Sequence, residues 1–157
     1  MENKLKELGK TSTDKLPNHI GIIPDGNRRW ARCQNKNVYL GHYAGYRTLK
    51  DILYDFLDVG IKYITIYALS LENLRNRSEK EINDIYTIVD KAIDAIKNEP
   101  LIKEEQVKIR LLGRLNLLPK KIKEKLAEIE DYTKEHDKFF LNVLIAYDGQ
   151  EEIVDAV

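Results

Sequence analysis

The sequence predicts an α/β fold: a mostly parallel sheet with helices on both faces. Short β-branched or aromatic runs alternate with longer segments whose apolar residues recur at helical spacing, in the order β-α-β-α-β-α-β. This order is typical of βαβ units joined by right-handed crossovers. With 157 residues, of which 43% are hydrophobic and 33% charged, the chain has the size and composition of one globular domain.

Four short runs are the expected strands. His19–Ile23 is an apolar run that ends at a proline, and residues 63–67 read Tyr-Ile-Thr-Ile-Tyr. Val107–Leu112 and Phe139–Tyr147 are the other two. All four are rich in the β-branched and aromatic residues that fit a half-buried pleated surface.

Three apolar stripes at helical spacing lie between these strands. They cover residues 49–57, 82–96 and 122–132. Gly60 follows the first stripe and Pro100 follows the second, and both residue types are helix stop signals. The stripes therefore predict three amphipathic helices that pack on the sheet.

The two ends of the chain are expected to differ from the rest. Residues 1–16 mix charges without an apolar core, so we expect a loosely held N-terminal segment before a domain at 17–157. A further helix begins near Glu151 and meets no stop signal before Val157. We therefore expect the domain to be C-terminally incomplete, with an open sheet edge at the last strand.

The charge balance excludes one class of partner. Lys+Arg and Asp+Glu both number 26, which gives no basic excess, so we expect no nucleic acid partner. The sequence has no apolar run long enough to span a bilayer and no apolar signal segment, and we expect a cytoplasmic protein. The single cysteine, Cys33, excludes an intramolecular disulfide.

The segment Asp25 to Arg29 (Asp-Gly-Asn-Arg-Arg) follows the first expected strand. Ligands of open α/β sheets bind beyond the carboxyl ends of strands. A carboxylate can hold Mg²⁺, and arginine forks fit phosphate oxygens. An ordinary strand-to-helix turn also uses Asp-Gly-Asn, but acidic residues are preferred at the start of a helix. Two arginines there favour a bound anion, and the segment indicates a diphosphate site.

Two further segments add polar residues beside expected strands or helices. In Gly41-His42-Tyr43-Ala44-Gly45 the two glycines permit close approach and His42 can donate to phosphate. Taken alone, however, this segment is better explained by a capping glycine with a surface histidine. Residues 68–77 follow the second strand, and a capping box of Ser78 and Glu81 accounts for the next helix start. The capping box does not explain the polar residues before it, Ser70, Glu72 and Asn73. Polar ends of neighbouring strands predict one shared crevice.

The order and spacing of these motifs resemble those of the cis-prenyltransferases, which make long polyprenyl diphosphates. The matching strings, over about residues 18–157, are His-x-x-x-x-x-Asp-Gly-Asn-x-Arg-Trp, Gly-His-x-x-Gly, Tyr-Ala-x-Ser-x-Glu-Asn, Leu-Leu-Gly and Leu-Asn-Val-x-x-Ala-Tyr. Pro24 and the Arg28-Arg29 pair resemble the archaeal and eukaryotic branch of the family.

The resemblance implies a prenyltransferase that condenses isopentenyl diphosphate onto an allylic diphosphate, farnesyl or geranylgeranyl, with cis stereochemistry. It implies that Asp25 holds Mg²⁺ and the diphosphate, and that Asn73 is the proton acceptor. The substrate-binding positions that it implies are Gly26, Asn27, Arg28, Arg29, Trp30, His42, Ser70, Leu71, Glu72, Leu74 and Arg77.

The resemblance also implies a homodimer when the chain is complete, and it allows peripheral contact with a membrane. The growing chain needs a dry tunnel, and the stripes at 49–57 and 82–96 are candidates for its walls, although core packing accounts for most of each stripe.

Several positions depart from the family pattern. Val38 stands where an arginine is frequent, Leu74 where an aromatic residue is usual, and Arg75 and Arg77 compete for one arginine position. The C-terminal Arg-x-Ser-Gly and Arg-Leu-Ser segments, which bind isopentenyl diphosphate in the family, are absent from these 157 residues. We therefore expect weak or absent elongation by this chain alone.

Two other functions stay open from the sequence. One is a non-catalytic cis-prenyltransferase-like subunit or prenyl-diphosphate-binding domain. Asp25, Asn27 and Asn73 favour the enzyme, whereas the absent C-terminal segments favour this alternative. The other, a generic phosphate-binding Rossmann-like domain, is weaker because the sequence has neither Gly-x-Gly-x-x-Gly nor a P-loop.

Overall fold

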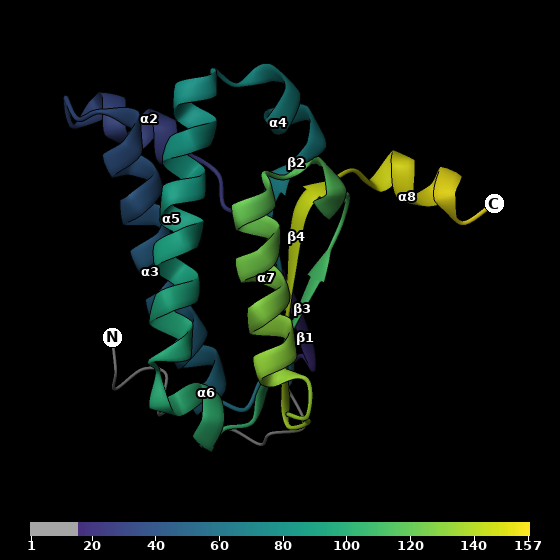
Figure 1. The fold of residues 1–157 in the computed structure, drawn as a ribbon. Helices are drawn as coiled ribbons and strands as arrows, with labels where there is room; N and C mark the ends of the chain where they lie inside the picture. The colour runs from purple at the N-terminus through teal and green to yellow at the C-terminus, as the bar shows by residue number, and fades with distance from the viewer. Residues whose placement is uncertain (1–15) are drawn as a thin grey trace.

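The computed structural model describes residues 16–157, which form a four-stranded parallel sheet and a layer of helices (Figure 1). The expected N-terminal segment, residues 1–16, lies outside the described residues except for Leu16. The strands are β1 (His19–Ile22), β2 (Tyr63–Ser70), β3 (Val107–Leu112) and β4 (Phe139–Tyr147). Their order across the sheet is β1-β2-β4-β3, and each neighbouring pair is parallel. The α/β class with a parallel sheet is confirmed.

The helices follow the predicted apolar stripes. They are α2 (Asn27–Cys33), α3 (Val38–Asp58), α4 (Leu71–Asn76), α5 (Glu79–Lys97), α6 (Pro100–Glu104), α7 (Lys120–Thr133) and α8 (Gly149–Asp155), with a 3-10 turn at Leu115–Leu117. Side-chain caps fix several starts: Asn37 accepts from the Leu40 N–H, and Ser78 accepts from the Glu81 N–H. None of the helices within residues 16–157 has the length and apolar content needed to cross a membrane.

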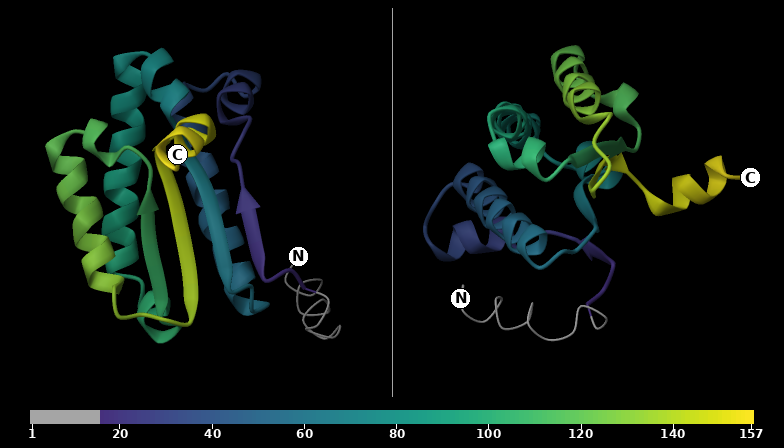
Figure 2. Two further views of the ribbon diagram at one scale, coloured as in Figure 1. Left: turned by 90° about the vertical axis from the view of Figure 1, so that its right-hand side faces the viewer. Right: turned by 90° about the horizontal axis from the view of Figure 1, so that it is seen from below.

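The three long helices α3, α5 and α7 lie side by side on one face of the sheet, and the short α8 leaves from the other side (Figures 1 and 2). Ion pairs join α5 to α7: Lys125 Nζ lies 2.5 Å from Asp90 Oδ1, and Lys97 pairs with Glu128. Buried strand residues such as Ile64, Ile109 and Leu141 form the core with these helices.

One crossover differs in hand from the other two. The chain passes from β1 to β2 and on to β3 in one direction across the sheet, then returns through α7 to β4 in the opposite direction. Because α7 covers the same face as α3 and α5 (Figure 2), the β3-α7-β4 connection must have the opposite hand. The expectation of right-handed crossovers throughout is therefore wrong.

The position of α7 is explained by the outer edge of β3. The Ile109 N–H donates to the Thr133 hydroxyl at 3.1 Å, and the Leu111 N–H donates to Glu130 Oε1 at 2.7 Å. Two α7 side chains thus pair with edge groups that would otherwise be open to another strand. The expected open edge at residues 139–147 is also wrong, because β4 lies between β2 and β3.

We predict that Thr133→Val destabilises the protein by about 1–3 kcal/mol, because it leaves the buried Ile109 N–H without its acceptor. The Thr133 hydroxyl is fully buried, accepts from the Ile109 N–H and donates to the Ile129 carbonyl at 2.9 Å. Thr87→Val is the matched control, because Thr87 is exposed and its hydroxyl donates only to Asn83. Urea unfolding of both variants measures the difference, and equal stabilities would contradict the edge role.

Candidate functional site

The candidate site lies where β1 and β2 end. These strands are parallel neighbours, so their carboxyl ends meet at one edge of the sheet. After β1 the chain leads to Asp25 and α2, and after β2 the Ser70 hydroxyl caps α4 by accepting from the Asn73 N–H at 2.9 Å. The predicted meeting of the two polar strand ends at one edge is confirmed.

One buried carboxylate joins three basic side chains at this edge. Oε1 of Glu81 lies 3.0 Å from His42 Nε2, 3.4 Å from Arg77 Nη1 and 3.5 Å from Arg28 Nε. The four residues come from α5, α3, the α4–α5 loop and α2, and the Glu81 side chain is only 10% exposed. We call these residues the Glu81 cluster. Two permanently charged guanidinium groups outnumber the one carboxylate, so the cluster favours an anion.

The Glu81 cluster contains one of the two candidate arginines. Arg77 belongs to the cluster, whereas Arg75 points to Glu151 of α8 at 4.0 Å. Burial lowers the pKa of the Arg77 guanidinium, and the nearby Glu81 charge opposes that effect. Arg77 Nε is buried and has no hydrogen-bond acceptor within residues 16–157. An unsatisfied guanidinium donor beside a positive cluster is suited to a phosphate oxygen.

Asp25 forms the exposed part of the site. Its side chain is 85% exposed, its Oδ1 accepts from the Gly26 N–H at 2.6 Å, and its Oδ2 lies 4.0 Å from Arg29 Nη2. Gly26 has φ +91°, a left-handed conformation that glycine adopts without strain. Residues 16–157 contain no group of three or more His, Cys, Asp or Glu side chains arranged for a metal. One free carboxylate nevertheless fits Mg²⁺, which is commonly held by one or two carboxylates together with substrate phosphates.

Gly41 and Gly45 allow α2 to pack against α3. A β-carbon at Gly41 would lie 2.3 Å from the Asn27 carbonyl oxygen, and one at Gly45 would lie 2.3 Å from the Asn27 side-chain oxygen. The predicted close approach is confirmed, and the group that approaches is Asn27. The two glycines therefore place the start of α2, including Arg28, beside His42.

The remaining predicted residues differ in exposure. Leu71 is 1% exposed and belongs to the core, and Leu74 packs against that core. Trp30 is 43% exposed, with the Lys36 ammonium 4.9 Å from its ring, and Glu72 is exposed. The structure therefore gives Leu71 a packing role and leaves Trp30 and Glu72 available at the surface.

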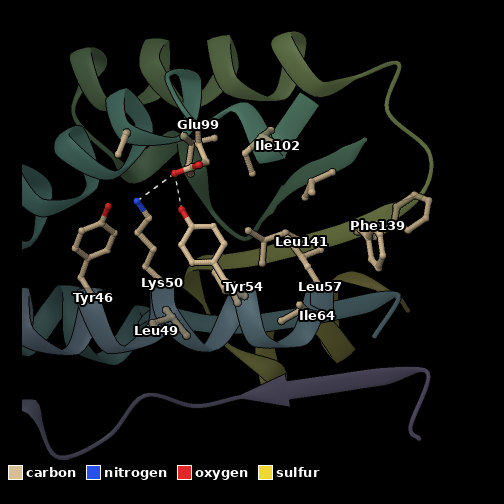
Figure 3. Close-up of a pocket in the computed structure, with 15 residues that line it drawn as sticks. Tyr46, Leu49, Lys50, Tyr54, Leu57, Ile64, Glu99, Ile102, Phe139 and Leu141 are labelled. Atoms are coloured by element: carbon tan, nitrogen blue, oxygen red, sulfur yellow. Dashed lines mark hydrogen bonds and ion pairs between the residues drawn. The ribbon is translucent and has the colours of Figure 1, made fainter. Parts of the chain in front are cut away.

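An apolar pocket lies at the other end of the helical layer, between α3, α5, α6 and the strands (Figure 3). Leu49, Leu53 and Leu57 of the first predicted stripe face it, and so does Ile96 of the second. We call it the α3–α5 pocket, and the other residues that line it are Tyr46, Lys50, Tyr54, Ile64, Ala95, Glu99, Ile102, Val107, Phe139, Phe140 and Leu141.

A polar trio crosses one wall of the α3–α5 pocket (Figure 3). The Tyr54 hydroxyl donates to Glu99 Oε2 at 2.5 Å, and Lys50 Nζ lies 3.3 Å from the same oxygen. The Tyr54 hydrogen bond and the Lys50 charge lower the pKa of Glu99 against the opposing effect of desolvation. These contacts tie α3 to the segment between α5 and α6.

Sequence reasoning missed Glu81 and the polar trio as functional groups. Glu81 was expected only as half of a capping box, and the Ser78 hydroxyl does accept from its N–H at 3.3 Å. Its carboxylate contacts the three basic side chains of the Glu81 cluster. The spacing of Arg77 and Glu81, four residues apart, was the available signal. Lys50 and Tyr54 are also four residues apart on one helix, but nothing in the sequence pointed to Glu99, which meets them only in the fold.

Comparison with known proteins identifies the family. The sequence profile described as "Putative undecaprenyl diphosphate synthase" matches residues 23–157. The chain belongs to the undecaprenyl diphosphate synthase family. It is 42% identical over 144 residues to a tritrans,polycis-undecaprenyl-diphosphate synthase (geranylgeranyl-diphosphate specific) from Methanocaldococcus jannaschii, and 38% identical over 156 residues to the Archaeoglobus fulgidus protein of the same name. These matches cover 92% and 99% of this chain but 51% and 61% of those relatives.

Solved structures agree with this family assignment. Lavandulyl diphosphate synthase from Lavandula x intermedia, crystallised with dimethylallyl diphosphate, aligns with a TM-score of 0.83 at 31% identity, over 89% of this chain and 59% of that one. A probable undecaprenyl diphosphate synthase from Campylobacter jejuni aligns with a TM-score of 0.70 at 26% identity, over 88% of this chain and 58% of that one. The described residues therefore have the fold shared by these family members.

We predict an acid-sensitive contribution of Glu99 to stability. Because its pKa is lowered in the folded protein, its stabilisation is complete above the ordinary value of 4.5 and is lost as the pH falls through the folded-state pKa. Urea unfolding at a series of pH values should show the wild type losing its advantage over Glu99→Gln in that acid range. Tyr54→Phe removes the donor and should shrink the same pH-dependent advantage. An advantage that stays constant with pH would contradict the assignment.

Proposed function

We propose that the whole protein is a cis-prenyltransferase that condenses isopentenyl diphosphate onto geranylgeranyl or farnesyl diphosphate to make a long polyprenyl diphosphate. The observation that carries this proposal is the combination of a cationic cluster at the carboxyl edge with an apolar pocket along the same helix. His42 lies near the start of α3 and Leu57 near its end, and the helix rises about 22 Å between them. The diphosphate group of a prenyl diphosphate matches the cationic cluster at one end, and its apolar prenyl chain matches the pocket at the other.

The residues at the polar end have distinct proposed roles. Arg28, Arg77 and His42 bind the allylic diphosphate, because the cluster leaves a positive excess and a free Arg77 donor. Asp25 holds Mg²⁺ against the same diphosphate, with Arg29 4.0 Å away. When bound, the metal supplies charge stabilisation to the departing diphosphate. Asn73, held at the start of α4 by the Ser70 cap, is the proposed proton acceptor.

The names of the relatives support the enzyme over a non-catalytic subunit. The Methanocaldococcus jannaschii relative is named as specific for geranylgeranyl diphosphate, which makes that substrate the first choice for the starter here. Further parts of the proposal rest on the family resemblance: a homodimer, a cytoplasmic location and peripheral contact with the membrane that takes up an apolar product.

Asp25→Asn should weaken Mg²⁺-dependent binding of geranylgeranyl diphosphate by about tenfold or more, because it removes the charged metal ligand. The fold should persist, since the Asp25 side chain is 85% exposed. Isothermal titration of the 157-residue chain, with and without Mg²⁺, measures the effect. Asp131→Asn is the control, an exposed carboxylate on α7 that pairs with Lys134. If Asp25→Asn binds like the control, the metal assignment is wrong.

Ala95→Phe should separate the two ends of the site. Ala95 lines the α3–α5 pocket, and a phenyl ring there would occupy the space proposed for the prenyl chain. We expect geranylgeranyl diphosphate to bind several-fold more weakly while inorganic pyrophosphate binds as in the wild type. If both ligands lost affinity equally, or if neither lost affinity, the prenyl chain would have to bind outside the α3–α5 pocket. Circular dichroism checks that the variant folds.

A further inference from the structure

Two features of the Glu81 cluster set Glu81 apart from an ordinary helix-start residue, its contacts and its burial. Its carboxylate faces basic groups from three separate segments, each through the same oxygen, Oε1. The side chains of Glu81 and His42 are both 10% exposed, and that of Arg77 is 18% exposed. Charges screened so little by water interact strongly. Glu81 is therefore the one group that holds these segments together electrostatically.

The contacts made by Glu81 leave ligand-binding atoms free. Arg28 meets Glu81 through Nε, which leaves both of its terminal nitrogens for another acceptor. Arg77 meets Glu81 through Nη1, and its Nε is buried without an acceptor in the described residues, so Arg28 presents the more accessible donors. The Arg28 side chain is 48% exposed, so it reaches the surface where a ligand would enter. If Glu81 only competed with the ligand for the arginines, its carboxylate would occupy the arginine nitrogens that face the ligand.

Repulsion explains why a carboxylate is needed. Arg28 and Arg77 carry like charges, and without an anion between them they would be driven apart. The pKa of Arg77 is lowered mainly by burial and further by Arg28, while Glu81 acts in the opposite direction. With Glu81 present, both guanidinium groups stay within 3.5 Å of one oxygen before any ligand arrives. Binding groups that are already in place cost less to order when the ligand binds.

We propose that Glu81 is a positioning residue for the diphosphate site: it holds Arg28, His42 and Arg77 in place and does not itself contact substrate. This deepens the proposed function and rests on it, because the cations that Glu81 positions are the proposed diphosphate ligands. The carboxylate therefore strengthens anion binding, although its own charge is negative.

The experiment measures binding of inorganic pyrophosphate to the 157-residue chain by isothermal titration. Glu81→Gln keeps the shape of the side chain and removes its charge, and we expect the Kd to rise about tenfold. Asp90→Asn is the matched control, since Asp90 lies on the same helix and pairs with Lys121 and Lys125 away from the cluster. Its Kd should equal that of the wild type. Unchanged or tighter binding by Glu81→Gln would overturn the proposal and leave Glu81 as a competitor of the ligand.

Two further variants separate positioning from a general structural effect. Glu81→Asp keeps the charge on a shorter side chain and should bind pyrophosphate with a Kd between those of the wild type and Glu81→Gln. In a double-mutant cycle with Arg77→Gln, the Glu81→Gln effect should become smaller, because one of the three groups that Glu81 positions is gone. Additive losses would indicate a purely structural role. If the wild type itself binds no pyrophosphate, the proposed function fails first, which is distinguishable from failure of the Glu81 proposal.

Discussion

The parallel pairing of all four strands is the constraint on which the rest of the molecule depends. Parallel strands begin at one edge of the sheet and end at the other, so each connection must run back along its length. The polar residues after β1 and β2 therefore gather at one edge. The apolar pocket lies toward the opposite end, where β2, β3 and β4 begin. Because α3 is 21 residues long, one element contributes to both regions.

Close packing and charge then arrange the polar edge. Gly41 lets the Asn27 backbone of α2 approach α3 more closely than a β-carbon would allow, and Gly45 leaves room for the Asn27 side chain. Glu81 of α5 contacts the same two helices, through an ion pair with Arg28 of α2 and through His42 Nε2 of α3 at 3.0 Å. The glycine packing and the Glu81 contacts thus have two effects. They fix the positions of the helices, and they also fix the positions of the basic side chains. The proposed diphosphate site therefore shares residues with the packing of α2, α3 and α5.

The fold was largely predictable, since strand composition and helical stripes are local signals. Val107–Leu112 and Phe139–Tyr147 have the predicted bounds, and Ile23 alone falls outside its predicted strand, where it is 76% exposed. The hand of the last crossover was not predictable, because it depends on contacts of α7 with the β3 edge. Among the site residues, the Asp25–Arg29 segment was found from its charges. The meeting of Glu81 with Arg28 and His42 required the tertiary structure, because these residues lie far apart in the sequence.

The unusual connection through α7 also bears on how the chain folds. The Ile109–Thr133 hydrogen bond that joins β3 to α7 spans 24 residues, whereas the Asn142–Thr65 bond between β4 and β2 spans 77. The entropy lost on closing a loop grows with its length, so the short loop closes at lower cost. β3, α7 and β4 can thus form a local nucleus onto which the β1-α3-β2 half docks later. The Glu81 cluster would then be completed late in folding, because none of its four residues belongs to β3, α7 or β4.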